Sequence, residues 1–339
     1  MKHLRNLLLG ALGATVVLQC ATEYKVIARY PVPGSGGWDY VTLDVAARRL
    51  YISHATQVEV LDVDNGKAVG VIPDTPGVHG IAITKDSKRG YTSNGRENKV
   101  SVFDPSTLRV IKKVDVGKGP DGIYFDPASN RVFTNNHGSH DVTALDADSG
   151  DVVGTVKLAG DGEQAVIGSD GSIYVNSEDT AEVIAFDPKS LQVKKRFPIG
   201  VAKTPTGLAY DSKTNRLFIG CREEPKMVVM DAGSGKVIAS FPIGKGVDFA
   251  GFDPSSRLIF FSSGGDGTLS IFHEDSPDVY KEAAVVKTLP SAKTMAFDPK
   301  TKKIFLPAAE FEESPSPDPS KGPRRTVKPG SFAILVVGK

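Results

Sequence analysis

The side chains that point most directly to chemistry are a set of mostly ionisable residues at a nearly constant spacing. They are Asp39, His79, Asp121, Glu163, Thr206, Asp248 and Lys293, which lie 40 to 45 residues apart. Four of the seven carry a carboxylate, and carboxylates that converge repel one another unless a cation or shared protons relieve the repulsion. If the fold brings the set together, the sequence predicts a site for a hard cation, with Ca²⁺ as the first choice.

Two interpretations of this set remain open. In the first, His79 transfers protons near neutral pH and a metal is held by the four carboxylates, Asp39, Asp121, Glu163 and Asp248. In the second, no metal binds. Acidic residues at the start of strands often accept hydrogen bonds from backbone N–H groups in turns, and the charges of Lys293 and His79 balance theirs.

Further candidate binding residues lie close to this set or in a basic segment. Trp38 is the only tryptophan and directly precedes Asp39. An exposed tryptophan could stack on a base or a sugar ring; alternatively, it packs between the first and last repeats. Arg222 follows the second strand of its repeat, and Arg324 and Arg325 lie in a basic stretch near the end of the chain.

The spacing of these residues reflects an internal repeat. Each repeat begins with a short apolar segment that ends in Asp or a substitute for it. These segments are residues 41–44, 81–84, 123–126, 165–168, 208–211, 250–253 and 295–298. A polar turn and an aromatic-bearing segment follow, then an alternating segment, a Gly-bearing turn and a fourth segment, as in residues 50–53, 58–62 and 69–72. Because Asn-Gly and Ser-Gly turns suit tight hairpins, the sequence predicts four antiparallel strands in each repeat.

Seven such repeats predict an all-β fold. Four-stranded units of this kind bury their apolar faces against one another when they are arranged around a central axis as a β-propeller. The sequence therefore predicts a seven-bladed β-propeller of four-stranded antiparallel blades. The last repeat has no fourth strand at its own end, whereas residues 24–32 have the alternating, β-branched character of one. We predict that residues 24–32 join the last blade, pair with residues 332–337 and close the ring, which removes two open sheet edges. The strand entries would then surround one mouth of a central channel.

The repeats resemble those of a known family, the bacterial YVTN-repeat or YncE-like β-propellers. The closest local match is Ile173-Tyr174-Val175-Asn176 followed by residues 183–187, and the other repeats are degenerate. The resemblance covers the whole chain after its leader and implies the propeller fold. It also implies single-stranded DNA binding as part of the family picture, with Trp38 and the basic stretch as the nucleic-acid contacts.

One segment departs from the repeat. Residues 310–330 are inserted between the second and third strands of the last blade; the run at 314–319 is rich in proline, and the second half is basic. Proline-rich segments are stiff and extended, and loops of this length are usually functional or disordered. The insertion is expected either to lie over the channel as a flap or to extend into solvent.

The first residues predict export. Lys2 and Arg5 precede an apolar run over residues 7–18, which is typical of a secretory signal peptide and too short to span a membrane. We therefore expect a signal peptide over residues 1–21 and a single propeller domain over residues 22–339, with a periplasmic or extracellular location and no transmembrane segment. Lipid anchoring at Cys20 is the alternative, although Gln19 replaces the small residue that such signals usually carry.

Composition narrows the function further. Without the leader, 39 Lys and Arg face 40 Asp and Glu, and this balance argues against a broadly nucleic-acid-binding surface. Cys221 is then the only thiol, so no internal disulfide is expected. The GxSxG, Walker, CxxCH and paired CxxC motifs are missing, which argues against catalysis by those routes.

Two functions from different classes fit these observations. The first is an exported, monomeric binding scaffold that holds a protein, a peptide, a small molecule or single-stranded DNA at its channel face. The second is a Ca²⁺-dependent hydrolase or lyase of lactone-type or sugar-type substrates with its site in the channel. We favour the binding function.

Overall fold

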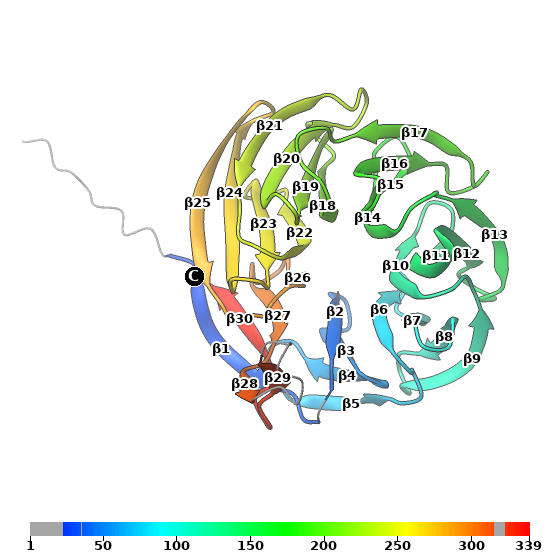
Figure 1. The fold of residues 1–339 in the computed structure, drawn as a ribbon. Helices are drawn as coiled ribbons and strands as arrows, with labels where there is room; N and C mark the ends of the chain where they lie inside the picture. The colour runs from blue at the N-terminus through cyan, green and yellow to red at the C-terminus, as the bar shows by residue number, and fades with distance from the viewer. Residues whose placement is uncertain (1–22, 35, 315–322) are drawn as a thin grey trace, which may run out of the picture.

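A computed structural model describes residues 23–34, 36–314 and 323–339 of the chain. In this part of the chain, seven four-stranded antiparallel sheets stand around a central axis as the blades of a propeller (Figure 1). The innermost strand of each blade faces the axis, and the outermost lies at the rim. The predicted seven-bladed β-propeller is confirmed.

The first three blades follow the repeat strand by strand. Blade 1 consists of β2 Trp38–Asp44, β3 Arg49–His54, β4 Gln57–Asp62 and β5 Ala68–Ile72. Blade 2 consists of β6 Val78–Ile83, β7 Gly90–Asn94, β8 Lys99–Asp104 and β9 Arg109–Asp115. Blade 3 consists of β10 Pro120–Asp126, β11 Arg131–Asn136, β12 Asp141–Asp146 and β13 Val152–Lys157, with the short helix η1 His137–Ser139 after β11.

The next three blades keep the same order, and the last differs. Blade 4 consists of β14 Gly162–Ile167, β15 Ile173–Ser177, β16 Glu182–Phe186 and β17 Val193–Pro198. Blade 5 consists of β18 Pro205–Asp211, β19 Arg216–Cys221, β20 Lys226–Asp231 and β21 Val237–Pro242. Blade 6 consists of β22 Val247–Asp253, β23 Leu258–Ser263, β24 Thr268–Ser276 and β25 Val279–Lys287. Blade 7 consists of β26 Ala296–Phe297, β27 Ile304–Ala308, β30 Ala333–Gly338 and β1 Lys25–Pro31.

The recurring Asp at the end of the innermost strand holds the turn that follows. In blade 1, the Oδ1 atom of Asp44 accepts hydrogen bonds from the N–H groups of Ala46 and Ala47 at 3.0 and 2.9 Å. In blade 3, Asp126 accepts the equivalent two N–H groups, one on each carboxylate oxygen. The side chain thus satisfies backbone donors that the turn leaves free, which explains why the repeat preserves this residue type.

The core lies between blades. Apolar clusters fill the interfaces between neighbouring sheets; for example, Phe133 and Val142 of blade 3 pack with Ile173 and Phe186 of blade 4. The aromatic residues of the second strands, such as Tyr51 and Phe218, are fully buried there. Each blade is therefore stabilised by its two neighbours, as expected of a repeat architecture in which one unit cannot bury its own apolar face.

The N-terminal strand closes the ring as predicted. Strand β1 pairs antiparallel with β30, from Lys25 opposite Gly338 to Pro31 opposite Ala333. The N–H of Val32 continues the pairing by donating to the carbonyl of Phe332 at 3.0 Å. The first and last parts of the chain therefore share one sheet, and the outer edge of β30 is covered.

The insertion in the last blade begins and ends as a hairpin. Strand β28 Phe311–Ser314 pairs with β29 Arg324–Val327, and residues 315–322 lie outside the described residues. Figure 1 shows the hairpin near the seam between blades 7 and 1, away from the centre of the ring. The proposed signal peptide and Cys20 also lie outside the described residues. Within those residues, no helix has the length and apolar character required to cross a membrane.

Candidate functional site at the channel mouth

The seven residues singled out by the repeat share one structural position, and we call them the ring residues. From blade 1 to blade 6, each is the second residue of the innermost strand; Lys293 lies just before β26. In these six blades, the pairing of the innermost strand with the next shifts its register at this point, for example between Trp38 and Val41. Such irregularities re-aim side chains and are frequent beside functional sites.

Side chains from the preceding blade fix the backbone of several ring residues. The Asn135 amide of blade 3 donates to the carbonyl of Glu163 in blade 4 at 2.5 Å. The Ser262 hydroxyl of blade 6 donates to the carbonyl of Lys293 at 2.6 Å. Thr206, itself a ring residue, donates to the carbonyl of Val247 at 2.8 Å and is fully buried. Thr206 therefore supports the backbone of the mouth.

On one side of the mouth, permanent cations neutralise the carboxylates. The Nζ atom of Lys293 lies 3.0 Å from Oδ1 of Asp39 and 2.8 Å from Oδ2 of Asp248. Arg222 also pairs with Asp248, and it reaches Glu178 at 3.1 Å. Two of the four predicted metal ligands, Asp39 and Asp248, are thus bound to a lysine.

On the other side, histidines face carboxylates. The Nδ1 atom of His79 lies 2.7 Å from Oδ2 of Asp39 and 3.8 Å from Oδ2 of Asp121. His137, from the loop after β11, approaches Asp121 through Nδ1 and Glu163 through Nε2, both at 3.8 Å. No lysine or arginine among the described residues pairs with Asp121 or Glu163.

Ionisation of the carboxylates follows this asymmetry. Burial by itself raises the pKa of Asp39, but the hydrogen bond with His79 and the charge of Lys293 outweigh it and hold this pKa below its usual value. Burial, together with the charge of Asp39, raises the pKa of Asp121. Burial and the charges of Asp121 and Asp248 raise the pKa of Glu163 well above its ordinary range. The half of the mouth without a permanent cation therefore holds protons more tightly.

Tyr40 shows that the carboxylates converge. Its side chain is buried, and burial followed by the charges of Asp121, Glu163, Asp39 and Asp248 raises the pKa of its hydroxyl. All four carboxylates therefore lie close enough to the Tyr40 hydroxyl to act on it.

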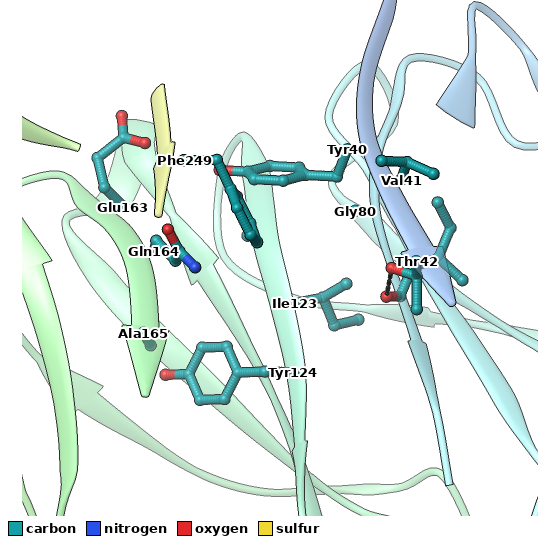
Figure 2. A pocket seen from close by; sticks show the side chains of 12 residues that line it. Tyr40, Val41, Thr42, Gly80, Ile123, Tyr124, Glu163, Gln164, Ala165 and Phe249 are labelled. Carbon is teal, nitrogen blue, oxygen red and sulfur yellow. Dashed lines mark hydrogen bonds between the residues drawn. The ribbon is translucent and has the colours of Figure 1, made fainter. Parts of the chain in front are cut away.

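The channel below the mouth has a floor that the sequence did not predict. Tyr40 and Phe249, whose ring centroids are 6.0 Å apart, meet beside Gln164 (Figure 2). The Gln164 carboxamide joins blade 4 to blades 5 and 6, accepting from the N–H groups of Leu208 and Ala250 at 2.9 Å and donating to the carbonyl of Ala250 at 2.9 Å. These three side chains border a cavity of about 130 Å³. The one available signal was the amide of Gln164 at a position that is glycine or aromatic in most other repeats.

Trp38 lies beside the mouth in a separate apolar groove. Its ring stacks on Phe332 at 4.7 Å between centroids and lies 6.3 Å from Phe311 of β28. The groove has a volume of about 510 Å³ and is bordered by Gly36, Gly37, Trp38, Ser291, Lys293, Phe311, Thr326 and Val327. We call it the seam groove, because it follows the seam between blades 7 and 1. Trp38 therefore packs between blades 1 and 7, which is one of the two alternatives; stacking on a base or a sugar ring stays a prediction.

Of the remaining predicted residues, some contact neighbouring side chains and others are exposed to solvent. The Arg325 guanidinium lies 4.8 Å from the centre of the Phe311 ring and 3.8 Å from the Glu313 carboxylate, whereas Arg324 is exposed. Burial raises the pKa of the Cys221 thiol to about 12, so this thiol is an inert packing group. The Ca²⁺ site of four carboxylates stays a prediction, and it requires the ion pairs of Lys293 with Asp39 and Asp248 to break.

The Lys293 bridge leads to a prediction about pH. We expect Lys293→Met to destabilise the protein by about 1 to 3 kcal/mol at pH 8, less than the roughly 3 to 5 kcal/mol typical of breaking a buried pair, because the lysine side chain is 39% exposed. The loss should shrink towards pH 5: without the lysine, the pKa of Asp39 rises in the folded state, and protonation then relieves the unpaired charge. Thermal unfolding at both pH values measures this.

The matched control is Lys281→Met. Lys281 pairs with Asp275 at 3.0 Å on the exposed surface, where such pairs contribute about 0 to 1 kcal/mol. A Lys293→Met loss that is equal at pH 5 and pH 8 would show that the lysine acts through packing and not through charge.

Comparisons with known proteins agree with the fold. The protein-family model of the YncE-like beta-propeller matches residues 82–295. No curated protein matches the sequence. Among solved structures, the chain is similar to one described as Kuenenia stuttgartiensis hydrazine synthase, with a TM-score of 0.71 and 18% identity over 81% of this chain and 94% of that chain, a likeness of fold alone. Because the family model covers more than half of the chain, the protein belongs to the YncE-like β-propeller family.

Proposed function

We propose that this protein is a binding propeller that holds an organic ligand in the seam groove, next to the channel mouth. The observation that carries the proposal is the groove itself. Its volume of about 510 Å³ lies within the range of roughly 300 to 1,000 Å³ that is typical of small-molecule sites. Trp38, Phe311 and Val327 give it an apolar lining, and Lys293 connects it to the charged mouth.

The chemistry around the groove favours a ligand with an apolar part and a cationic or hydrogen-bond-donating part. The apolar part would lie against Trp38 and Phe311, and the polar part would reach the carboxylates of the mouth. A peptide or a small amine fits this description. The phosphates of single-stranded DNA fit less well, because the mouth is rich in carboxylates and because two basic groups of the hairpin, Arg325 and Lys328, already face Glu313 and Glu310.

The only tryptophan of the chain provides the experiment. Because Trp38 borders the groove, its fluorescence reports binding there directly. We expect short peptides that combine aromatic and basic residues to change this emission saturably, and Val327→Ser to weaken the binding at least fivefold. Val279→Ser, at an exposed valine of β25, is the matched control and should have no effect.

Two outcomes would contradict the groove as the binding site. One is that no peptide or amine in the screen changes the emission of Trp38. The other is that single-stranded DNA binds with a steep dependence on salt, is lost in Arg324→Ala with Arg325→Ala, and is unaffected by Val327→Ser. Phosphate contacts produce such salt dependence, and the basic hairpin would then be the site.

We also propose that the protein works outside the cytoplasm, as a monomer. The support for export is the basic start and the short apolar run of residues 1–21, which resemble a secretory signal peptide. Fractionation of cells that produce the full chain, with mass measurement of the mature N-terminus, tests export and distinguishes cleavage from lipid attachment at Cys20.

A further inference from the structure

The channel mouth contains a cluster of nitrogen and oxygen donors that is separate from the seam groove. One donor atom from each of Asp39, His79 and Asp121 lies within 4.8 Å of the other two. The Oδ2 atom of Asp121 is 3.8 Å from Nδ1 of His79 and 3.8 Å from Nδ1 of His137. This distance is too long for a hydrogen bond. It matches two ligands of one metal ion, because bonds of roughly 2.0 to 2.2 Å place neighbouring ligand atoms about 3 to 4 Å apart.

One buried oxygen atom in this cluster has no hydrogen-bond donor and no cation beside it within the described ranges. The Oδ1 atom of Asp121 is buried without a partner. The Glu163 side chain is only 8% exposed; the ring of His137 lies 3.8 Å from it, and the Glu178 carboxyl group is its hydrogen-bond neighbour. Figure 2 shows the Glu163 carboxylate pointing away from Ala165 and Tyr124. Buried carboxylate oxygens are costly unless a proton or a cation satisfies them.

The tautomer of His137 leaves a lone pair facing a carboxylate. Nε2 of His137 lies 3.0 Å from the carbonyl oxygen of Gly162, and because a carbonyl can only accept, Nε2 carries the hydrogen. In the neutral ring, Nδ1 therefore presents its lone pair to Asp121. Histidines that bind metals typically donate their other N–H to a carbonyl or carboxylate in this way.

The charged side chains of the mouth carry an excess of negative charge, which a bound cation would neutralise. Five carboxylates, those of Asp39, Asp121, Glu163, Glu178 and Asp248, meet two permanent cations, Lys293 and Arg222. Five minus two leaves a formal charge of −3 before histidine ionisation or proton uptake. The two permanent cations pair with Asp39, Asp248 and Glu178, so the deficit is concentrated at Asp121 and Glu163, where the histidines also lie.

We propose that the channel mouth binds one divalent transition-metal ion of the Zn²⁺ class, held by Asp121, His79 and Asp39, whose donor atoms lie together, while His137 contacts Asp121 from beside the site. The metal takes the place of the proton between His79 and Asp39. The imidazole nitrogens decide the class of metal, because Ca²⁺ takes six to eight oxygen ligands whereas imidazole suits Zn²⁺, Co²⁺ and Ni²⁺. The proposal is independent of any ligand in the seam groove.

The test uses the purified full chain, stripped with a chelator and titrated with Zn²⁺ by calorimetry. We expect one ion to bind with a dissociation constant of about 1 μM or below. His79→Gln and Asp121→Asn should each weaken binding at least tenfold, and His137→Gln should weaken it about threefold to tenfold. Zn²⁺ should raise the melting temperature of the wild-type protein, because a ligand of the folded state stabilises it, and should not do so in Asp121→Asn.

Two control variants separate this site from the other histidines. His273→Gln removes a histidine that pairs with Asp275 at 2.6 Å on β24, and it should leave Zn²⁺ binding unchanged. His140→Gln breaks a partly exposed cluster with Asp161 and Asp179, and it should also have no effect. Circular dichroism before titration confirms that each variant is folded.

Several results would overturn the proposal. They are no binding at 100 μM Zn²⁺, tighter binding of Ca²⁺ than of Zn²⁺, or binding that His140→Gln abolishes while His79→Gln and Asp121→Asn preserve it. If peptides change the Trp38 fluorescence but Zn²⁺ does not bind, the metal site is overturned and the groove remains as the proposed binding site. If Zn²⁺ binds but no peptide changes the fluorescence, the groove is overturned and the metal site remains.

Discussion

Removal of residues 23–33 is expected to abolish cooperative unfolding of this protein near its full-length melting temperature. Strand β1 is the only partner of the outer edge of β30 among the described strands, and its residues Val26, Ala28 and Tyr30 pack against the apolar clusters of the last blade. The deletion exposes this edge and these clusters together. We expect a loss above about 5 kcal/mol, comparable with the whole stability of many proteins, measured by circular dichroism on heating.

Two controls test whether pairing of the closing strand is the cause. Arg29→Ala changes a half-exposed residue of β1 and keeps the strand, so it should shift the melting temperature by no more than a few degrees. A synthetic peptide of residues 23–34, added to the shortened chain, should restore part of the stability by adding the strand to the free edge. A shortened chain that melts as sharply and at the same temperature as the full chain would show that the ring closes without β1.

The second large effect is expected at Arg48, which joins blade 1 to blade 7. Its NH1 and NH2 atoms donate to the two carboxylate oxygens of Asp298 at 3.1 and 2.8 Å, and it also contacts Asp64. The Asp298 side chain has no exposed surface. We expect Arg48→Met to destabilise the protein by about 3 to 5 kcal/mol, because it leaves a buried carboxylate without its cation. Urea unfolding at pH 7 measures the loss.

The double variant and acid pH identify the source of that loss. Adding Asp298→Asn to Arg48→Met should recover part of the stability, since no buried unpaired charge then remains. Burial raises the pKa of Asp298, but hydrogen bonds, above all from Arg48 and then from the Thr301 hydroxyl, outweigh it and lower this pKa to about 2 from 3.8. This difference contributes roughly 2 kcal/mol above pH 4 and is lost as the pH falls towards 2. Asp298→Asn alone should remove that part of the acid sensitivity; unchanged acid sensitivity would contradict the assignment.

The sequence by itself determined the fold, and the reason is physical. Each repeat forms its strands from local patterns, such as the apolar segment that ends at Asp44 or Asp126, and its turn is held by the same aspartate side chain. One four-stranded sheet cannot bury its own faces, so seven of them must pack side by side. The repeat also placed the ring residues at one mouth, because equal positions in equal blades lie on the same face.

The tertiary structure alone decided how those residues interact. The spacing predicted four carboxylates for one Ca²⁺ ion; in the folded chain, Lys293 joins Asp39 to Asp248, while Asp121 and Glu163 face histidines. Gln164 bonds to Ala250 across the channel. Such contacts depend on ring closure and on rotamers fixed by neighbouring blades, which no local pattern encodes. The seam groove likewise exists only because β28 packs beside Trp38, at a joint between the two ends of the chain.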